Sequence, residues 1–118
     1  MTTLRSDSIP ELSVESLAHI LASLDHPTQL VDVREASELD LVQLPGFMHL
    51  PLSQFPVWSE TIHAQLDAQT RTIVICHHGM RSAQMCAWLI QQGFTQVENV
   101  IGGIDAYALR VDASLPRY

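Results

Sequence analysis

The sequence predicts an α/β fold in which a central parallel sheet carries helices on both faces. Short apolar runs rich in β-branched residues alternate with longer segments of helical periodicity along the chain. That order favours parallel strands joined by crossover helices. The run Leu30–Val33 is bounded by Pro27 and by the charged pair Arg34-Glu35, as expected of a short buried strand. These observations indicate the doubly wound α/β class.

Capping residues, prolines and glycines indicate where the predicted helices and strands begin and end. Ser13 can cap a first helix, which has an apolar face and which Asp25-His26-Pro27 should end. The apolar face of that helix comprises Val14, Leu17, Ile20, Leu21 and Leu24. The expected strands cover residues 30–33, 47–50, 72–76 and 97–101. The later helices are expected over residues 36–44, 59–66, 81–92 and 104–109, with a helical turn over 53–56. Gly93 lies just past the end of the helix over 81–92.

Length and composition limit the class of protein. The 118 residues suit a single domain, 1–118, in which residues 1–10 are expected to be a loosely ordered leader. A net charge of −7 argues against nucleic acid or an anionic membrane as a partner. No apolar run is long enough to span a membrane and no signal-peptide pattern appears, so a cytoplasmic location is expected. Two cysteines in that compartment should be free thiols.

The stretch Ile73–Ser82 carries the chemistry. An apolar run ends in Cys76, a short polar loop follows, and an apolar helix begins. The loop amides, the helix N-terminus and Arg81 would each favour a thiolate, which is the reactive form of cysteine. Gly79 permits a tight loop whose amides converge on an anion, and the fork of Arg81 suits an oxyanion. Because ligands bind at the carboxyl ends of parallel strands, Cys76 is expected to lie near the end of the strand that carries Asp32 and Arg34.

Other interpretations compete at several of these residues. Cys76 could be a buried small hydrophobe, and Arg81 could pair with a surface carboxylate. His77 and His78 suggest a metal, but neighbouring loop residues should point apart and no further ligand has suitable spacing, so no metal or cofactor is predicted. Cys86 falls on the sheet-facing side of its helix and should be a core residue. Trp88 is expected to be half exposed on a mostly polar face.

The chain also resembles the rhodanese family of sulfurtransferases in its single-domain form. The resemblance covers residues 11–118 and rests on several motifs in the family's order. They are Leu30-Val31-Asp32-Val33-Arg34-Glu35, Leu44-Pro45-Gly46, His49-Leu50-Pro51-Leu52, Cys76-His77-His78-Gly79-Met80-Arg81-Ser82, Gly93-Phe94 and Asn99-Val100-Ile101-Gly102-Gly103-Ile104-Asp105-Ala106.

The resemblance implies a rhodanese-like fold and a thiosulfate sulfurtransferase-like reaction. Cys76 would take a sulfur atom from thiosulfate or a persulfide donor and pass it to a thiophilic acceptor, such as cyanide, a thiol or a protein. Arg81 would help to hold the anionic donor, while Asp32 and Arg34 would be a supporting pair. The loop residues that would line the substrate site are His77, His78, Gly79, Met80 and Ser82.

Two alternatives belong to other functional classes. A persulfide carrier or binding module with a specific protein partner would keep the same loop, and Trp88 could then serve in docking. A phosphatase or arsenate reductase would also use a thiol and an arginine. However, residues 77–80 make a shorter connection than the loop of protein tyrosine phosphatases, which argues against a phosphoryl group.

Overall fold

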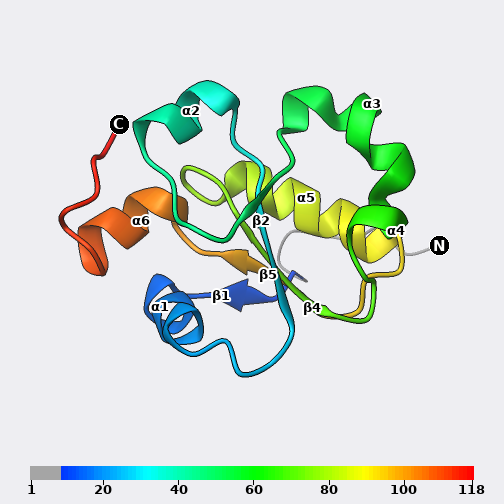
Figure 1. The fold of residues 1–118 in the computed structure, drawn as a ribbon, viewed down its shortest axis with the longest axis horizontal. Coiled ribbons are helices and arrows are strands. Elements are labelled where there is room, and N and C mark those ends of the chain that lie inside the picture. The colour runs from blue at the N-terminus through cyan, green and yellow to red at the C-terminus, as the bar shows by residue number, and fades with distance from the viewer. Residues whose placement is uncertain (1–8) are drawn as a thin grey trace.

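The sheet is five-stranded and entirely parallel, with helices on both faces, which confirms the predicted fold class (Figure 1). The computed structural model describes residues 9–118. The strand order is β1-β5-β4-β2-β3. The strands are β1 (Glu11–Leu12), β2 (Thr28–Asp32), β3 (Met48–His49), β4 (Arg71–Ile75) and β5 (Val97–Val100). The α-helices are α1 (Val14–Ala22), α2 (Ala36–Leu41), α3 (Phe55–Trp58), α4 (Ile62–Gln65), α5 (Met80–Gln91) and α6 (Gly103–Arg110), and 3₁₀ turns η2 and η3 cover Leu52–Gln54 and Ser59–Thr61.

Central strand β4 divides the core into two layers. Its side chains alternate between the faces of the sheet, as the strand period requires. Ile73 and Ile75 face the cluster that includes residues of α1 and α6, whereas Val74 and Cys76 face the cluster built with α3, α4 and α5. All four are essentially inaccessible to solvent. Cys76 therefore continues the buried alternation of its strand onto the α5 side.

Several element boundaries differ from the sequence expectation. Helix α1 is capped by Ser13, which accepts a hydrogen bond from the amide of Ser16 as predicted, but it ends at Ala22. Leu24 is consequently 55% exposed and does not join the apolar face. Helix α2 stops at Leu41. Val42, which has an extended backbone, and Leu44 enter the core from the segment that follows the helix.

The first strand was not predicted. Residues 1–8 of the expected leader lie outside the described residues, but Ile9 is buried and Glu11–Leu12 pairs with β5. The amides of Asn99 and Ile101 donate to the carbonyls of Pro10 and Leu12, at 2.9 Å each. A strand of two residues has no detectable periodicity, so only its partner strand β5 defines it. The expectation of a loose leader is therefore wrong for residues 9–10.

The carboxyl ends of β2, β4 and β5 meet at one edge of the sheet. Asp32 lies opposite Ile75 in the register of β2 and β4, and the amide of Val33 donates to the Ile75 carbonyl at 3.2 Å. This places Cys76 beside the end of the strand that carries Asp32, as the topology predicted.

In the described part of the chain, no helix has the length and apolar character needed to cross a membrane.

Gly103 fixes the position of the strand end that holds Cys76. At the start of α6, the amides of Ile104 and Asp105 donate to the carbonyls of Cys76 and His77, at 2.9 and 3.1 Å. A Cβ atom at Gly103 would lie 2.4 Å from both carbonyl oxygens, and the residue has φ of +61°. Only glycine allows this close approach.

Gly103→Ala is therefore expected to lower the free energy of unfolding strongly, because it adds a steric clash to backbone strain. Gly93 is the matched control, since it also has a positive φ, of +96°, but a Cβ there would meet nothing within 4 Å. Gly93→Ala should cost about 1–2 kcal/mol, and Gly103→Ala at least about 2 kcal/mol more. Urea denaturation measures both, and equal losses would contradict the close-packing argument.

Candidate active site

Cys76 lies directly after β4 and is 1% exposed. The amide of Gly79 donates a hydrogen bond to its Sγ atom at 3.0 Å. The hydroxyl of Ser82 lies 3.2 Å from the same sulfur. Gly79 adopts φ of +101° at the start of α5, which turns its amide toward the sulfur. The sulfur thus already has two polar contacts within the loop.

Asn99 of β5 orders these contacts, although the sequence analysis did not single it out as a site residue. Ser82 donates to Asn99 Oδ1 at 2.5 Å, and Asn99 Nδ2 donates to the Gly79 carbonyl at 3.1 Å. Both side chains are buried. With its hydrogen given to Asn99, the Ser82 hydroxyl meets the thiol as an acceptor, and it must rotate to donate to a thiolate. Asn99 therefore links β5 to the loop and controls the orientation of Ser82.

Arg81 is paired with a carboxylate that the sequence analysis did not name. Its Nη1 and Nη2 atoms donate to Oε1 and Oε2 of Glu38 at 2.6 and 2.8 Å. The amide of Glu35 and the hydroxyl of Tyr118 also donate to Glu38, at 3.0 and 2.7 Å. The hydrogen bonds from Arg81 are the main reason that the pKa of Glu38 falls to about 2. Glu38 is therefore ionised and held in place by these donors.

Asp32 and Arg34 form a buried ion pair behind the loop. Arg34 is fully buried; its Nε and Nη2 atoms donate to Asp32, and Nη2 also donates to the Val42 carbonyl at 2.9 Å. Its remaining Nη1 atom donates to the hydroxyl of Tyr118 at 2.9 Å. Burial alone would lower the pKa of Arg34, but the hydrogen bonds to Asp32 and Tyr118 outweigh it and raise that pKa. The pair is thus part of a network and does not touch Cys76 directly.

Tyr118 connects the two arginines and covers the loop. Its hydroxyl accepts from Arg34 and donates to Glu38, so that Arg34, Tyr118, Glu38 and Arg81 form one continuous chain of hydrogen bonds. Its ring stacks on His77 with centroids 3.8 Å apart and planes 6° from parallel. Nothing in the local sequence around Tyr118 signals this role, because its partners come from residues far away in the chain.

The remaining loop residues differ in exposure. The ring of His77 lies between Tyr118 and His78, and burial lowers its pKa. Its Nε2 atom is buried and has no hydrogen-bond partner among the described residues. Met80 is 75% exposed and borders a mostly apolar cavity of about 330 Å³ together with Ile9, Ala83 and Ala87.

The expectation that His77 and His78 point apart, with no further ligand nearby, is wrong. The two rings do not point apart but lie against each other, 3.8 Å between centroids, and Asp105 adds a third donor within 4.8 Å of the others. Arg117, however, already engages both carboxylate oxygens of Asp105, at 2.9 and 3.3 Å. A metal ion would have to compete with that pair.

Cys86 and Trp88 belong to the core side of α5. Cys86 is fully buried, and burial raises the pKa of its thiol to about 12, so it is a poor nucleophile. Both cysteines are free thiols, as predicted. Trp88 is half-buried, as expected, and packs edge-on against Phe55 and Trp58. That aromatic cluster accounts for Trp88 without a docking partner.

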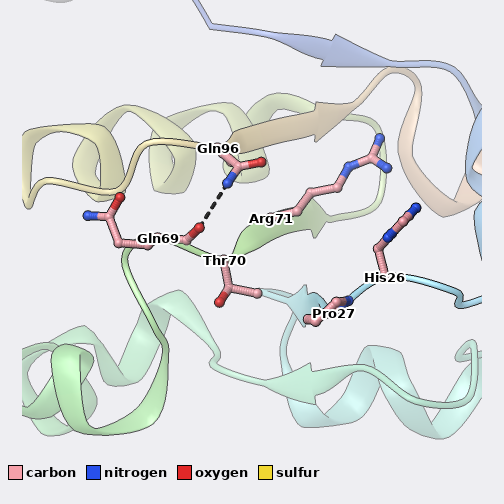
Figure 2. A pocket seen from close by; sticks show the side chains of 6 residues that line it. All are labelled: His26, Pro27, Gln69, Thr70, Arg71 and Gln96. Atoms are coloured by element: carbon pink, nitrogen blue, oxygen red, sulfur yellow. Dashed lines mark hydrogen bonds between the residues drawn. The ribbon is translucent and has the colours of Figure 1, made fainter.

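One cleft away from the loop lies at the opposite end of the sheet. Figure 2 shows the side chains that line it, contributed by the start of β4 and by the segments before β2 and β5. Its volume is about 470 Å³, and its lining residues are His26, Pro27, Gln69, Thr70, Arg71 and Gln96. Strand β4 separates it from Cys76 by roughly 17 Å. It therefore plays no part in the thiol site.

Comparisons with known proteins agree with this arrangement. The rhodanese-like domain family matches residues 13–110, and the chain belongs to that family. A sulfurtransferase from Allochromatium vinosum is 35% identical over 100 residues, which are 85% of this chain and 89% of that protein. A crystal structure of a rhodanese-like domain protein from Staphylococcus aureus has the same fold, with a TM-score of 0.74, 24% identity and coverage of 93% of this chain and 99% of the other.

Two further relatives are longer than this chain. The rhodanese-like/PpiC domain-containing protein 12, chloroplastic, of Arabidopsis thaliana is 48% identical over 90 residues, which cover 76% of this chain. A putative sulfur carrier protein of Bacillus subtilis is 33% identical over 99 residues, which cover 84% of this chain. The chain spans 30% of the plant protein and 51% of the bacterial one.

Tyr118→Phe tests the connection between the two arginines. The substitution removes the acceptor of buried Arg34 and a donor to Glu38, while the ring can still stack on His77. We expect the free energy of unfolding to fall by about 1–2 kcal/mol. Tyr107→Phe is the control, because no hydrogen bond of its hydroxyl occurs among the described residues, and it should change stability little. Equal effects in thermal unfolding would contradict the network.

The Glu38–Arg81 pair should also make stability depend on pH. Because the pKa of Glu38 is lowered to about 2 in the folded protein, its ionised form stabilises the fold above about pH 4.5. This contribution is lost as the pH falls from 4.5 toward 2. With half-exposed Arg81 screened by solvent, it should amount to about 1–2 kcal/mol. Urea denaturation should therefore show a difference between wild type and Glu38→Gln that is constant from pH 5 to 8 and shrinks toward pH 3.

Proposed function

We propose that this protein is a sulfurtransferase in which Cys76 carries the transferred sulfur as a persulfide. The donor would be thiosulfate or a persulfide, and the acceptor a thiophile such as cyanide or a thiol. The observation that carries the proposal is the contact of the Cys76 sulfur with the Gly79 amide and the Ser82 hydroxyl, at the carboxyl end of β4. Sulfur transfer by relatives of this family supports it.

The loop offers donors for an anionic sulfur. The first amides of a helix have no acceptors within the helix, and α5 begins directly after Gly79. The Gly79 amide already meets the inner sulfur. The amides of residues 80–82 would be available to the outer sulfur of a persulfide, and the helix N-terminus favours negative charge there.

The proposed cycle has two displacements. The Cys76 thiolate attacks the outer sulfur of the donor, a new S–S bond forms, and the donor's S–S bond breaks, its electron pair leaving with sulfite or with a thiolate. The acceptor then attacks the outer sulfur of the Cys76 persulfide and carries it away. The second step returns the thiolate, so the enzyme needs no external oxidant, reductant or cofactor.

The other site residues would act around this thiol. Arg81 would orient the donor through its free N–H groups, and His77, His78 and Met80 would form the entrance. Asp32 and Arg34 would support the loop through Tyr118 and Glu38, without reacting.

A carrier of persulfide sulfur is the second candidate. The relative described as a putative sulfur carrier protein favours it. A carrier would be loaded at Cys76 in the same way but would discharge to a protein acceptor only. Rapid discharge by cyanide or by a small thiol would favour the enzyme, and slow discharge would favour the carrier.

Mass spectrometry tests the role of Cys76. Wild-type protein incubated with thiosulfate or a persulfide donor should gain the mass of one sulfur atom, and Cys76→Ser should lose that gain. Cys86→Ala is the matched control, because it removes the other thiol, and it should still gain sulfur. We expect turnover with cyanide to fall at least about 1000-fold in Cys76→Ser, as for loss of a covalent nucleophile.

Two results would contradict the proposal. Sulfur loading that persists in Cys76→Ser and disappears in Cys86→Ala would show that Cys86, and not Cys76, carries the sulfur. Turnover of a generic phosphate ester that depends on Cys76, without sulfur loading, would favour a phosphatase instead.

A further inference from the structure

Arg81 contributes little net charge to the site. Its partner Glu38 accepts two hydrogen bonds from it, at 2.6 and 2.8 Å, and lies in the same partly exposed mouth of the loop. Glu35 and Tyr118 hold the carboxylate in that position. A bidentate pair of this kind leaves the guanidinium with hydrogen-bond donors but with its charge compensated.

No other arginine supplies uncompensated positive charge in the described part of the chain. The protein has no lysine, and its six basic residues are all arginines. Between residues 9 and 118, every arginine is paired with a carboxylate: Arg34–Asp32, Arg71–Glu98, Arg81–Glu38, Arg110–Glu15 and Arg117–Asp105. The chain as a whole carries a net charge of −7. Among residues 9–118, an anion that approaches Cys76 therefore meets backbone amides but no arginine whose charge is uncompensated.

The charge of the sulfur donor determines how strongly the lack of uncompensated positive charge affects its reaction with Cys76. Thiosulfate is a dianion, so its encounter with the Cys76 thiolate gathers three negative charges, which the products share as a persulfide anion and sulfite. The encounter of a hydropersulfide, R–S–S–H, with the Cys76 thiolate brings together only one negative charge. The Cys76 thiolate attacks the outer sulfur and the donor's thiolate, R–S⁻, leaves, so that charge and atoms are conserved. Like charges at contact distance repel by about 1 kcal/mol even in water, and by more in a partly buried site.

We propose that Glu38 is a specificity-determining residue, which compensates Arg81 and so directs the site toward sulfur donors of low charge, such as hydropersulfides, and away from dianionic thiosulfate. The inference rests on the proposed function and refines its donor. Arg81 keeps a directional role, because its remaining N–H groups can still orient a donor. The specificity follows from the fixed position of Glu38, which Glu35 and Tyr118 hold against the approach of a competing anion.

Two donors of matched chemistry isolate the charge. Thiosulfate and methanethiosulfonate both deliver an outer sulfur. Thiosulfate is a dianion and leaves as sulfite, whereas methanethiosulfonate is a monoanion and leaves as methanesulfinate. Their kcat/KM values should be measured with cyanide as acceptor at pH 8, where histidines with ordinary pKa values are neutral. The informative quantity is the ratio of the two values, thiosulfate over methanethiosulfonate.

Glu38→Gln should raise this ratio at least roughly threefold, because it removes one negative charge beside the donor and uncovers the charge of Arg81. Glutamine is accepted at the same helix position and can still receive the Glu35 amide, so the fold should persist, which circular dichroism checks. Asp40→Asn is the matched control: Asp40 lies exposed on the same helix, α2, and its loss changes the net charge equally. It should leave the ratio unchanged.

In wild type, the thiosulfate reaction should also accelerate with added salt more than the methanethiosulfonate reaction, because salt screens repulsion between like charges. An unchanged ratio in Glu38→Gln, or an equal rise in Asp40→Asn, would overturn the role of Glu38 while Cys76-dependent transfer stands. Failure of both donors to load Cys76 in wild type would instead overturn the proposed function.

Discussion

The buried pair of Arg34 and Asp32 is the interaction on which the rest of the site depends. Arg34 is fully buried at the carboxyl end of β2, where an unpaired charge would be very costly. Its Nε and Nη2 atoms donate to Asp32, Nη2 also donates to the Val42 carbonyl, and Nη1 donates to the Tyr118 hydroxyl. The need to satisfy one buried guanidinium therefore fixes the segment after α2 and Tyr118 at the same time.

From Arg34 the network reaches the loop that follows Cys76 along two routes. Tyr118 stacks on His77, and its hydroxyl donates to Glu38, which in turn holds Arg81 at the start of α5. Independently, Asn99 and Gly103 fix the loop from β5 and α6, through the Gly79 and Cys76 carbonyls. The Cys76 sulfur is thus surrounded by groups whose positions are set by several strands and helices together.

The network also constrains the chemistry available to the thiol. A site that holds its arginines with carboxylates gains a rigid loop, but it gives up uncompensated positive charge. Its attraction for anions then comes mainly from backbone amides, which favour a developing sulfur anion without favouring a highly charged donor. Rigidity and the proposed donor preference therefore have the same structural origin.

The sequence by itself determined the fold class, most of the elements and the position of the thiol. Apolar runs and helical periodicity are local patterns, so Ile73–Ser82 could be interpreted as a strand, a loop and a helix, and Gly93 as a helix end. The continuous apolar run Ile73-Val74-Ile75 placed Cys76 at a strand end.

Only the tertiary structure decided the partners of the site. Strand β1 is too short for a pattern and exists through β5. The local sequence does not signal the roles of Glu38, Asn99 and Tyr118, because these roles depend on residues brought together from distant segments. A charged side chain in a sequence indicates that a charge is present, but whether that charge is free or compensated is a property of the fold, as the pairing of Arg81 with Glu38 illustrates.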